Sequence, residues 1–398
     1  MFDPFDPAFI ADRYATYRRF RSESPVTRQP LGETHLSILW RYDDAAAMLK
    51  GRSTRIRPAG EAVPPHLGSG AAATMFENVL VLTDSPNHDR LRRLVNPFFT
   101  GRALEPLRAL VRRTVDELVE DLAGQATVDI VARFAARLPC IVVLTMMGVP
   151  RDDWDELIRR VPDFRPVFSP IPVQPESARR CEEACQYFID YFGGFIDRRT
   201  LAPGDTMADG LIGAHSDGDR LSRNELIAML YSFLDAGYES TMSTLANAIV
   251  GLAIHRDQLE VLLQRPDAAA TAVEEALRWD APIHFLRRTV AEPVEIHGVR
   301  IEPSDILLIS IASANRDESR FDQADRFDLG RGEGDHLSFG GGPHYCLGHQ
   351  LSRMELTYAV PALFKAFPDL RLVDELHERE EHFVFPARKR VDVHLGLK

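Results

Sequence analysis

The stretch of sequence that decides the fold lies near the C-terminus, where residues 339–355 read FGGGPHYCLGHQLSRME. It places Cys346 in a glycine-rich loop directly before a helical pattern. Glycine adopts positive φ and lets the backbone approach a flat ligand closely. A helix that begins after Cys346 would point backbone N–H groups and its positive dipole end at the sulfur, which lowers the pKa of the thiol. The loop therefore predicts a thiolate, the form of cysteine that binds a metal ion.

Other roles for this cysteine have weaker support. A lone cysteine is most often a small buried hydrophobic residue. A zinc site needs further ligands at short spacing, and the pair Cys181 and Cys185 lies on a polar, acidic stretch that indicates incidental packing or surface spacing. A nucleophilic cysteine needs a base positioned by the fold, and His344 alone does not decide this. A single axial thiolate on haem iron needs only one cysteine.

Six positions of the loop match the pattern F-G-x-G-x-H-x-C-x-G, which resembles the haem-binding loop of the cytochrome P450 family. The matching residues are Phe339, Gly340, Gly342, His344, Cys346 and Gly348. The resemblance implies haem b as the cofactor, with this loop binding it and Cys346 as the axial ligand of the iron. It also implies the family fold, a single domain over residues 1–398 that is mainly α with a small β lobe.

A second feature is an apolar pattern with three- and four-residue spacing, which predicts a helix over residues 223–254. Ser222, followed three residues later by Glu225, predicts a capping box at its start. A helix of about 32 residues would span about 48 Å, enough to cross the whole molecule. A glycine, an acid and two hydroxyls interrupt the apolar face at residues 234–241. This indicates either close packing against another helix or the approach of a ligand to the backbone.

The interruption resembles the oxygen-activating helix of the same family, whose pattern is A-G-x-[DE]-T. Ala236, Gly237 and Glu239 match this pattern. Ser240 takes the place of the threonine, and Thr241 follows it. The resemblance implies that the first two residues lie at the haem and leave room for O2, whereas Glu239, Ser240 and Thr241 organise water and deliver protons. Serine keeps the hydroxyl but lacks the methyl group that fixes the threonine rotamer.

Two further sets of residues resemble family positions. Glu275 and Arg278 match an E-x-x-R pair, which the family joins to an arginine of a later meander, here Arg326. Alone, such a pair is commonly a solvated pair on one helix face and contributes little to stability. The two haem propionates need positive partners if they are buried. The resemblance implies that they are held by His88, Arg92, Arg288 and His344.

The composition limits the class of protein. The chain has 398 residues, 45% of them hydrophobic and 27% charged, which is typical of a globular protein. Its net charge of −12 gives no overall field that attracts nucleic acid. The N-terminal residues MFDPFDP show no signal-peptide pattern, and the longest apolar stretch, residues 140–149, is too short for a membrane helix. We therefore expect a cytoplasmic protein with no membrane or nucleic-acid partner.

The periodicity of the chain predicts mostly helix. Helical spacing covers residues 84–279, whereas four shorter stretches alternate or are rich in β-branched residues. These expected β stretches are residues 34–40, 289–301, 306–311 and 383–395. No repeat or low-complexity tract interrupts the chain, which favours one compact unit.

The combined resemblance implies a haem-thiolate monooxygenase that inserts one oxygen atom from O2 into a C–H or C=C bond of a small organic substrate. By similarity to soluble bacterial members, it would act in natural-product metabolism as a monomer, with electrons from ferredoxin and ferredoxin reductase. Arg90, Arg93 and Arg353 are candidate docking residues for an acidic ferredoxin, with ordinary solvent exposure as the alternative. The alternative functions are an oxidative coupling enzyme, a peroxygenase and a non-enzymatic haem sensor.

By the same resemblance, the substrate pocket is expected to draw on residues 71–80, residues 164–174 and the C-terminal turn. The side chains expected to contact the substrate are Phe233, Ile283, His284, Phe285, Val384 and Phe385. The proline-rich, aromatic residues 164–172 fit a mobile roof over the iron. We expect a bulky apolar or aromatic substrate, and His284 either hydrogen-bonds a polar group of it or is satisfied by the backbone.

Overall fold

The computed structural model describes residues 1–51, 53–58, 60, 63–169, 173–202, 204–213, 220–331, 334–374, 378–380 and 382–396. The chain divides into two compact units. The first unit holds Met1–Arg55, Arg108–Pro139 and Glu239–Lys398, and the second holds Ile56–Leu107 and Cys140–Tyr238. Neither unit is one continuous stretch of chain. The expectation of a single domain over residues 1–398 stays a prediction.

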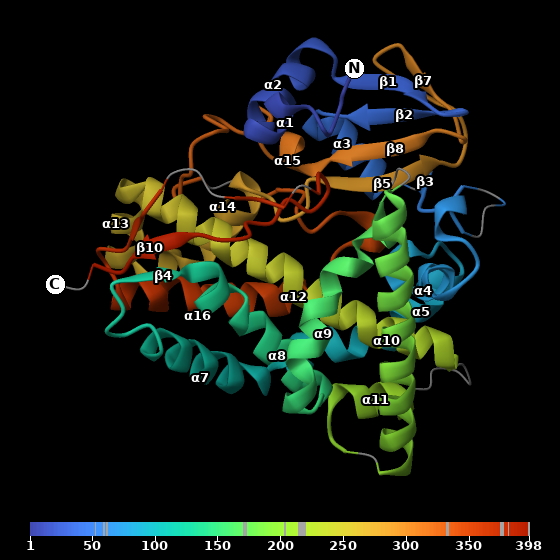
Figure 1. Ribbon diagram of the computed structural model, residues 1–398. Coiled ribbons are helices and arrows are strands. Elements are labelled where there is room, and N and C mark those ends of the chain that lie inside the picture. Colours follow the sequence, from blue (N-terminus) through green and yellow to red (C-terminus); the bar gives the residue numbers. More distant parts are fainter. Residues whose placement is uncertain are drawn as a thin grey trace. The chain divides into compact units, whose positions relative to one another are not determined.

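The β structure formed by the described residues lies in the first unit (Figure 1). Its strands are β1 (Val26–Leu31), β2 (Thr34–Leu39), β3 (Thr54–Arg55), β4 (Thr127–Asp129), β5 (Phe285–Val290), β6 (Val294–Ile296), β7 (Val299–Ile301), β8 (Ile306–Ser310), β9 (Arg371–Leu372) and β10 (Asp392–His394). One sheet has the order β1-β2-β8-β5-β3, a second has the order β4-β10-β9, and β6 pairs with β7. β2 and β8 are parallel, whereas β1 and β2 form an antiparallel hairpin.

Most of the expected β stretches form strands, with shifted ends. Residues 34–40 and 306–311 contain β2 and β8, and residues 289–301 contain the end of β5 and the β6–β7 hairpin. Residues 383–395 contribute only β10. β1 was not predicted, because Val26–Leu31 includes Pro30 and several polar residues and becomes a strand through its pairing with β2.

Helices make up most of both units, so the expected fold class, mainly α with a small β portion, is confirmed. The α-helices of the first unit are α1 (Pro7–Ala11), α2 (Arg13–Glu23), α3 (Tyr42–Lys50), α7 (Leu107–Glu120), α13 (Arg256–Gln264), α14 (Ala269–Trp279), α15 (Ile311–Ala314) and α16 (His349–Ala366). α15 packs against α2 and α3 beside the five-stranded sheet, and α14 packs against α16 (Figure 1).

The second unit is built from α4 (Ala71–Asn78), α5 (Asn87–Val95), α6 (Gly101–Leu104), α9 (Trp154–Arg160), α10 (Pro175–Leu201) and α11 (Met207–Gly213). Short 3-10 or π segments are η1 (Pro65–Leu67), η2 (Leu80–Leu82), η3 (Asn96–Phe99), η4 (Val131–Ala135), η5 (Arg151–Asp153), η6 (Val161–Phe168), η7 (Pro266–Ala268) and η8 (Gly342–His344). Within this unit α10 packs against α4 and η6. None of the helices in the described ranges is both long and apolar enough to cross a membrane.

Two helices, α8 (Arg137–Met147) and α12 (Arg223–Ile254), are divided between the units, and the first residue of α7, Leu107, also belongs to the second unit. α12 has the bounds that the periodicity predicts. The capping box is also confirmed: the backbone N–H of Ser222 donates to Glu225 Oε2 at 2.8 Å, and the N–H of Glu225 donates to Ser222 Oγ at 3.3 Å. A strong start signal and a long apolar pattern are local features, so the sequence alone locates this helix well.

Candidate functional site

The loop around Cys346 lies in the first unit and ends where α16 begins. The N–H of Cys346 donates to the carbonyl oxygen of Phe339 at 2.9 Å, and the N–H of Tyr345 donates to that of Gly342 at 3.1 Å. These bonds close the loop on itself and present Cys346, which is half-buried, three residues before the first residue of α16. The expected order of glycine-rich loop, cysteine and helix is confirmed.

Two glycines of this loop are required by its conformation. Gly340 and Gly342 have φ of 68° and 60°, a region that side chains other than glycine rarely adopt. A Cβ at Gly342 would also lie 2.6 Å from the carbonyl oxygen of Leu49, near the end of α3. The backbone of the loop therefore packs directly on that helix. A rigid loop of this kind fixes the direction of the Cys346 side chain.

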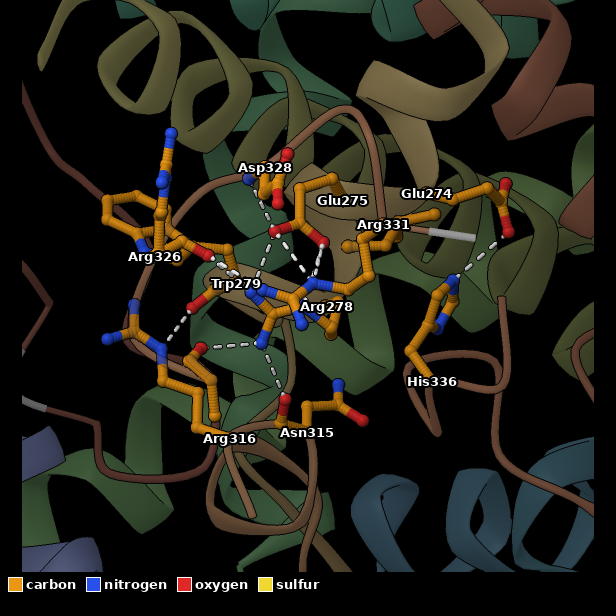
Figure 2. Close-up of polar contacts among 12 residues, drawn as sticks. Glu274, Glu275, Arg278, Trp279, Asn315, Arg316, Arg326, Asp328, Arg331 and His336 are labelled. Atoms are coloured by element: carbon orange, nitrogen blue, oxygen red, sulfur yellow. Dashed lines mark hydrogen bonds and ion pairs between the residues drawn. The ribbon is translucent and has the colours of Figure 1, made fainter. Parts of the chain in front are cut away.

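The loop is anchored to α14 by Arg353, which was expected only as a docking residue, and by Glu274 and His336, for which the sequence predicts no role. The guanidinium of Arg353 lies over the Phe339 ring, 4.4 Å from its centroid, and donates to both oxygens of Glu274 at 2.6 and 2.7 Å. His336 Nε2 lies 3.2 Å from Glu274 Oε2 (Figure 2). Burial opposes ionisation of Glu274, but the hydrogen bonds from Arg353 and His336 lower its pKa to about 2. Glu274 is therefore charged at neutral pH. Its only sign in the sequence is that it is an acidic residue directly before Glu275.

The E-x-x-R pair is buried and fully hydrogen-bonded. Glu275 and Arg278 lie on α14 with 4% and 1% of their surface exposed, and Arg278 Nε and Nη2 donate to the two Glu275 oxygens at 2.7 and 2.8 Å. The remaining N–H groups of Arg278 donate to the carbonyl oxygens of Asn315, Ala324 and Arg326 at 2.7 to 2.9 Å (Figure 2). All five donors of the guanidinium thus have an acceptor. The solvated-pair interpretation is wrong for this chain.

Arg326 takes part in this network differently from the expectation. Its carbonyl oxygen accepts from Arg278, but its guanidinium is 47% exposed and pairs with Asp257 at 3.0 Å. The arginine that reaches Glu275 is Arg331, whose Nε lies 3.4 Å from the carboxylate and whose side chain is only 6% exposed. The expected ion pair with the Arg326 side chain is therefore corrected to Arg331. The meander turns between these two positions, and that turn is not visible in the residue spacing.

The interrupted middle of α12 is less buried than the turns on either side of it. Ala236 is exposed and residues 237–240 are half-buried, whereas Leu234 and Thr241 on either side are buried. In the second unit, a Cβ at Gly237 would lie 3.1 Å from Val143 Cγ2 of α8. Close packing against a neighbouring helix is thus confirmed at Gly237. An exposed alanine within an apolar helix fits a ligand-facing surface as well.

The two hydroxyls that follow Glu239 have different surroundings within the first unit. Thr241 Oγ1 donates to Ser352 Oγ of α16 at 3.3 Å, so the Thr241 side chain points toward the helix that follows Cys346. Ser240 is half-buried, and its carbonyl oxygen accepts from the Thr244 hydroxyl at 2.8 Å. The proton-delivery roles of Glu239, Ser240 and Thr241 stay predictions.

The four residues expected at the propionates are divided between the units. In the first unit, Arg288 is buried on β5 and His344 ends η8, two residues before Cys346. In the second, His88 and Arg92 lie one turn apart on α5. Burial lowers the pKa of His88, which favours the neutral imidazole, a form that still donates one hydrogen bond to a carboxylate. Their contacts with a propionate stay predictions.

Two of the expected substrate contacts belong instead to the core of the first unit. Phe285 is 1% exposed and packs edge-on against Tyr17 and Trp40. His284 is equally buried, with Nδ1 2.8 Å from the Tyr17 hydroxyl and Nε2 3.8 Å from Asp280 Oδ1. Burial lowers the pKa of His284 to about 4. These two predictions are corrected, because Tyr17 of α2 packs against Phe285 and hydrogen-bonds His284. A side chain, and not the backbone, thus pairs with the His284 ring, and this long-range contact is not visible in the sequence.

The other expected substrate contacts have mixed surroundings. Phe233 in the second unit is buried edge-on against Phe99 at 5.0 Å. In the first unit, Val384 is buried and accepts from the His284 N–H, while Ile283 and Phe385 are half-buried. Of the proline-rich roof, residues 170–172 lie outside the described residues. Phe233, Ile283, Val384 and Phe385 stay predictions.

The candidate docking arginines are more engaged than expected. Arg353 is committed to Glu274, as described above. Arg90 pairs with Glu225 and donates to Asn87 Oδ1 at 2.7 Å in the second unit, while Arg93 is exposed on α5. Ordinary solvent exposure therefore does not describe Arg353 and Arg90, whose ion pairs hold secondary-structure elements in place.

Two of the remaining cysteines are packing residues. Cys181 and Cys185 are buried on α10 with their sulfur atoms 4.0 Å apart, so the packing interpretation is confirmed and the surface one is wrong. Their mutual hydrogen bond and burial raise the pKa of the Cys185 thiol. No disulfide is formed among the four cysteines. Of the four, Cys346 has the surroundings of a ligand.

The chemistry of the first unit fits a haem thiolate. A soft sulfur donor stands in a closed loop before the positive end of a helix, on a glycine backbone that a flat macrocycle can approach. Such a site defines the class of haem-thiolate oxygenases.

Comparison with known proteins agrees with that class. The sequence profile of the family described as Cytochrome P450 matches residues 12–265 and 268–389. Cytochrome P450 107B1 of Saccharopolyspora erythraea is 35% identical over 384 residues, covering 92% of this chain and 91% of the relative. 6-Deoxyerythronolide B hydroxylase of the same organism is 35% identical over 373 residues, covering 92% of this chain and 91% of the relative.

The structural comparison gives the same result. The polyketide-biosynthesis cytochrome P450 PksS of Bacillus subtilis has a solved structure that superposes with a TM-score of 0.91 at 29% identity and covers 100% of both chains. The chain belongs to the cytochrome P450 family. It is therefore a P450 monooxygenase whose cofactor is haem b, and it uses O2 and redox partners.

Proposed function

We propose that this enzyme inserts one oxygen atom from O2 into a C–H or C=C bond of a bulky, largely apolar polyketide-type natural product. Electrons come from ferredoxin and ferredoxin reductase, and the enzyme works as a monomer in the cytoplasm. The observation that carries the proposal is the acid–alcohol pair Glu239–Ser240 in the half-buried middle of α12. A haem carrier or sensor has no use for such a pair.

The substrate class is supported by the named relatives. One is a 6-deoxyerythronolide B hydroxylase and another belongs to polyketide biosynthesis. Both cover nearly the whole chain, so the resemblance extends beyond the cofactor site. The apolar character of the segments expected at the substrate, such as residues 71–76, agrees with a ligand that is bound mainly by burial of apolar surface.

The residues of the chain divide the chemistry among them. Haem, when bound, activates O2 and supplies the oxygen atom that is transferred. Cys346 would ligate the iron and donate electron density that favours O–O cleavage. Arg288 and His344, with His88 and Arg92, would hold the propionates by charge and hydrogen bonds. Glu239 and Ser240 would hold water and pass protons toward the site where O2 reacts, while Thr241 keeps its bond to Ser352.

Reconstitution tests the reaction and the electron source together. The holoenzyme is mixed with ferredoxin, its reductase, NADPH and 18O2, and macrolactones including 6-deoxyerythronolide B are screened first for a low-to-high-spin Soret shift. We expect a product one oxygen heavier that contains the label. A coupled product without label would replace the proposal by oxidative coupling. Faster turnover with peroxide alone than with the reductase system would replace it by a peroxygenase.

A further inference from the structure

The short helix α4 in the second unit has no capping side chain of its own. Its N-cap is Gly70, and the first N–H groups of a helix lack intrahelical partners. The partner is Glu182 of α10: Oε1 accepts from the Ala71 N–H at 2.6 Å and Oε2 from the Ala72 N–H at 2.9 Å. A carboxylate in this position also stabilises the positive end of the helix dipole. One side chain from a helix far along the sequence thus accepts hydrogen bonds from the first two N–H groups of α4.

Gly70 is fitted to that carboxylate. A Cβ at this position would lie 2.1 Å from Glu182 Oε1, inside any tolerated contact distance. Space for the carboxylate therefore favours a glycine at this position. An alanine at position 70 would have to push Glu182 off the helix end.

The other end of α4 is held from outside as well. Arg57 donates to the carbonyl oxygens of Phe76 and Glu77 at 2.7 and 3.1 Å, and its guanidinium lies 4.7 Å from the centroid of the Phe76 ring. A cation at the C-terminal end complements the dipole in the same sense as the anion at the start. A helix of eight residues is marginal by itself, so its order depends on these two contacts and on burial of its apolar face.

A cavity of about 310 Å³ lies beside the Glu182 contact. It is lined on one side by Gly70 and Ala72, on another by Cys181 and Glu182, and elsewhere by Pro166 and Val173. α4 lies within residues 71–80, and Pro166 and Val173 lie within residues 164–174, which are two of the stretches expected to contact the substrate. The volume falls in the range of small-molecule pockets. Glu182 therefore lines the cavity and at the same time holds the start of α4, which bounds the cavity.

We propose that Glu182 is a positioning residue that keeps α4 closed beside this cavity, and that its release sets the rate at which bulky apolar ligands exchange with the haem site. The inference rests on the proposed function for the role of these segments at the substrate. It adds a residue on α10 that controls exchange without touching the reacting atoms. Small ligands pass without release of α4.

The test compares Glu182→Ala with Glu183→Gln in the holoenzyme. Glu183 is the next residue on α10 and is exposed in an ion pair with Arg179, so it is a matched control. Hydrogen exchange of the Ala71 and Ala72 amides is expected to become at least tenfold faster in Glu182→Ala and to stay unchanged in the control. Unchanged exchange in Glu182→Ala would overturn the contact itself.

Azoles that bind haem iron report on exchange whatever the natural substrate is. Association of imidazole and of clotrimazole, a much bulkier azole, is followed by the Soret shift after rapid mixing. We expect clotrimazole to bind at least threefold faster to Glu182→Ala, with imidazole and the Glu183→Gln control unchanged. Equal acceleration of both azoles, or of neither, would overturn the gating role. Because no macrolactone is used, this outcome is independent of the substrate proposed above.

Gly70→Ala breaks the same contact from the other side. It is expected to reproduce the faster amide exchange and the faster clotrimazole binding. In the Glu182→Ala background its effect should disappear, since no carboxylate remains to collide with the new methyl group. Additive effects of the two substitutions would contradict the proposal. Unfolding of each variant by urea, read by circular dichroism, establishes that the measured protein is folded.

Discussion

Two segments of this P450 are fixed by carboxylates, and they are fixed in different ways. In the first unit, Arg278 is enclosed by Glu275 and three carbonyl oxygens, and Arg331 and the Asp328 N–H add further bonds to Glu275 (Figure 2). In the second unit, the start of α4 depends on the single side chain of Glu182. The first arrangement has many bonds in a dry interior, and the second has two bonds at a half-buried position.

This difference suits the two segments to different roles: the Arg278 network is a rigid scaffold, and α4 is a part that moves. Removing one member of a buried ion network leaves an uncompensated charge and costs about 3–5 kcal/mol. Losing a helix cap costs about 1 kcal/mol, which local fluctuations can supply. The Glu275–Arg278 network belongs to the same unit as the Cys346 loop and has to be rigid. In contrast, α4 bounds a cavity and has to open.

Arg278→Ala should have the largest effect. It leaves Glu275 buried without its main partner, so the free energy of unfolding is expected to fall by about 3–5 kcal/mol, with loss of haem on purification. Urea unfolding followed by circular dichroism, together with the haem content per chain, measures both. A loss below about 1 kcal/mol with full haem content would show that the network is not scaffold.

Low pH should reduce the free energy of unfolding of the first unit, because His284 is buried there. Burial lowers its pKa from 6.5 to about 4, so between these values the unfolded chain binds a proton that the folded chain does not. Stability from this residue is present above pH 6.5 and is lost as the pH falls to 4, by about 3 kcal/mol in total. His284→Gln should flatten the dependence of the unfolding free energy on pH over this range. Equal slopes in wild type and His284→Gln would contradict the account.

A smaller effect distinguishes Arg331 from Arg326. Arg331→Gln removes a buried partner of Glu275 and should lower the unfolding free energy by about 1–3 kcal/mol. Arg326→Gln removes an exposed ion pair and should cost less than about 0.5 kcal/mol, since its backbone carbonyl remains in place. The reverse order of the two losses would restore the pairing that the sequence suggested.

Ser240→Ala should have almost no effect on stability, because this stretch of α12 is only half-buried. If Ser240 passes protons, the variant keeps its haem but releases severalfold more hydrogen peroxide per NADPH consumed. Thr241→Val is the matched variant on the same helix. Unchanged coupling in Ser240→Ala with peroxide release in Thr241→Val would transfer the role to Thr241.

The sequence predicts those features whose signals are local. The capping box at Ser222 and the apolar spacing locate α12. The glycines around Cys346 indicate a loop whose backbone adopts conformations that few other residues allow. The E-x-x-R spacing places Glu275 and Arg278 on one helix face. Each of these signals lies within one or two turns of chain, where propensity and spacing act directly.

Features set by distant contacts could not be predicted in this way. Phe285 and His284 look like pocket residues beside a strand, but α2 brings Tyr17 against both. Arg331 replaces Arg326 because the meander turns between them, and β1 forms a strand through its partner. Glu182 and Gly70 have no sequence signal at all, since their fit depends on how α10 packs against α4.

The central claim is that Cys346 ligates the haem iron as a thiolate. The carbon monoxide difference spectrum of the reduced holoenzyme tests it most directly, with Cys181→Ala as a matched control for loss of a thiol. We predict the band typical of thiolate-ligated haem in the wild type and in Cys181→Ala, and its complete loss in Cys346→Ala. The same band in Cys346→Ala would contradict the account.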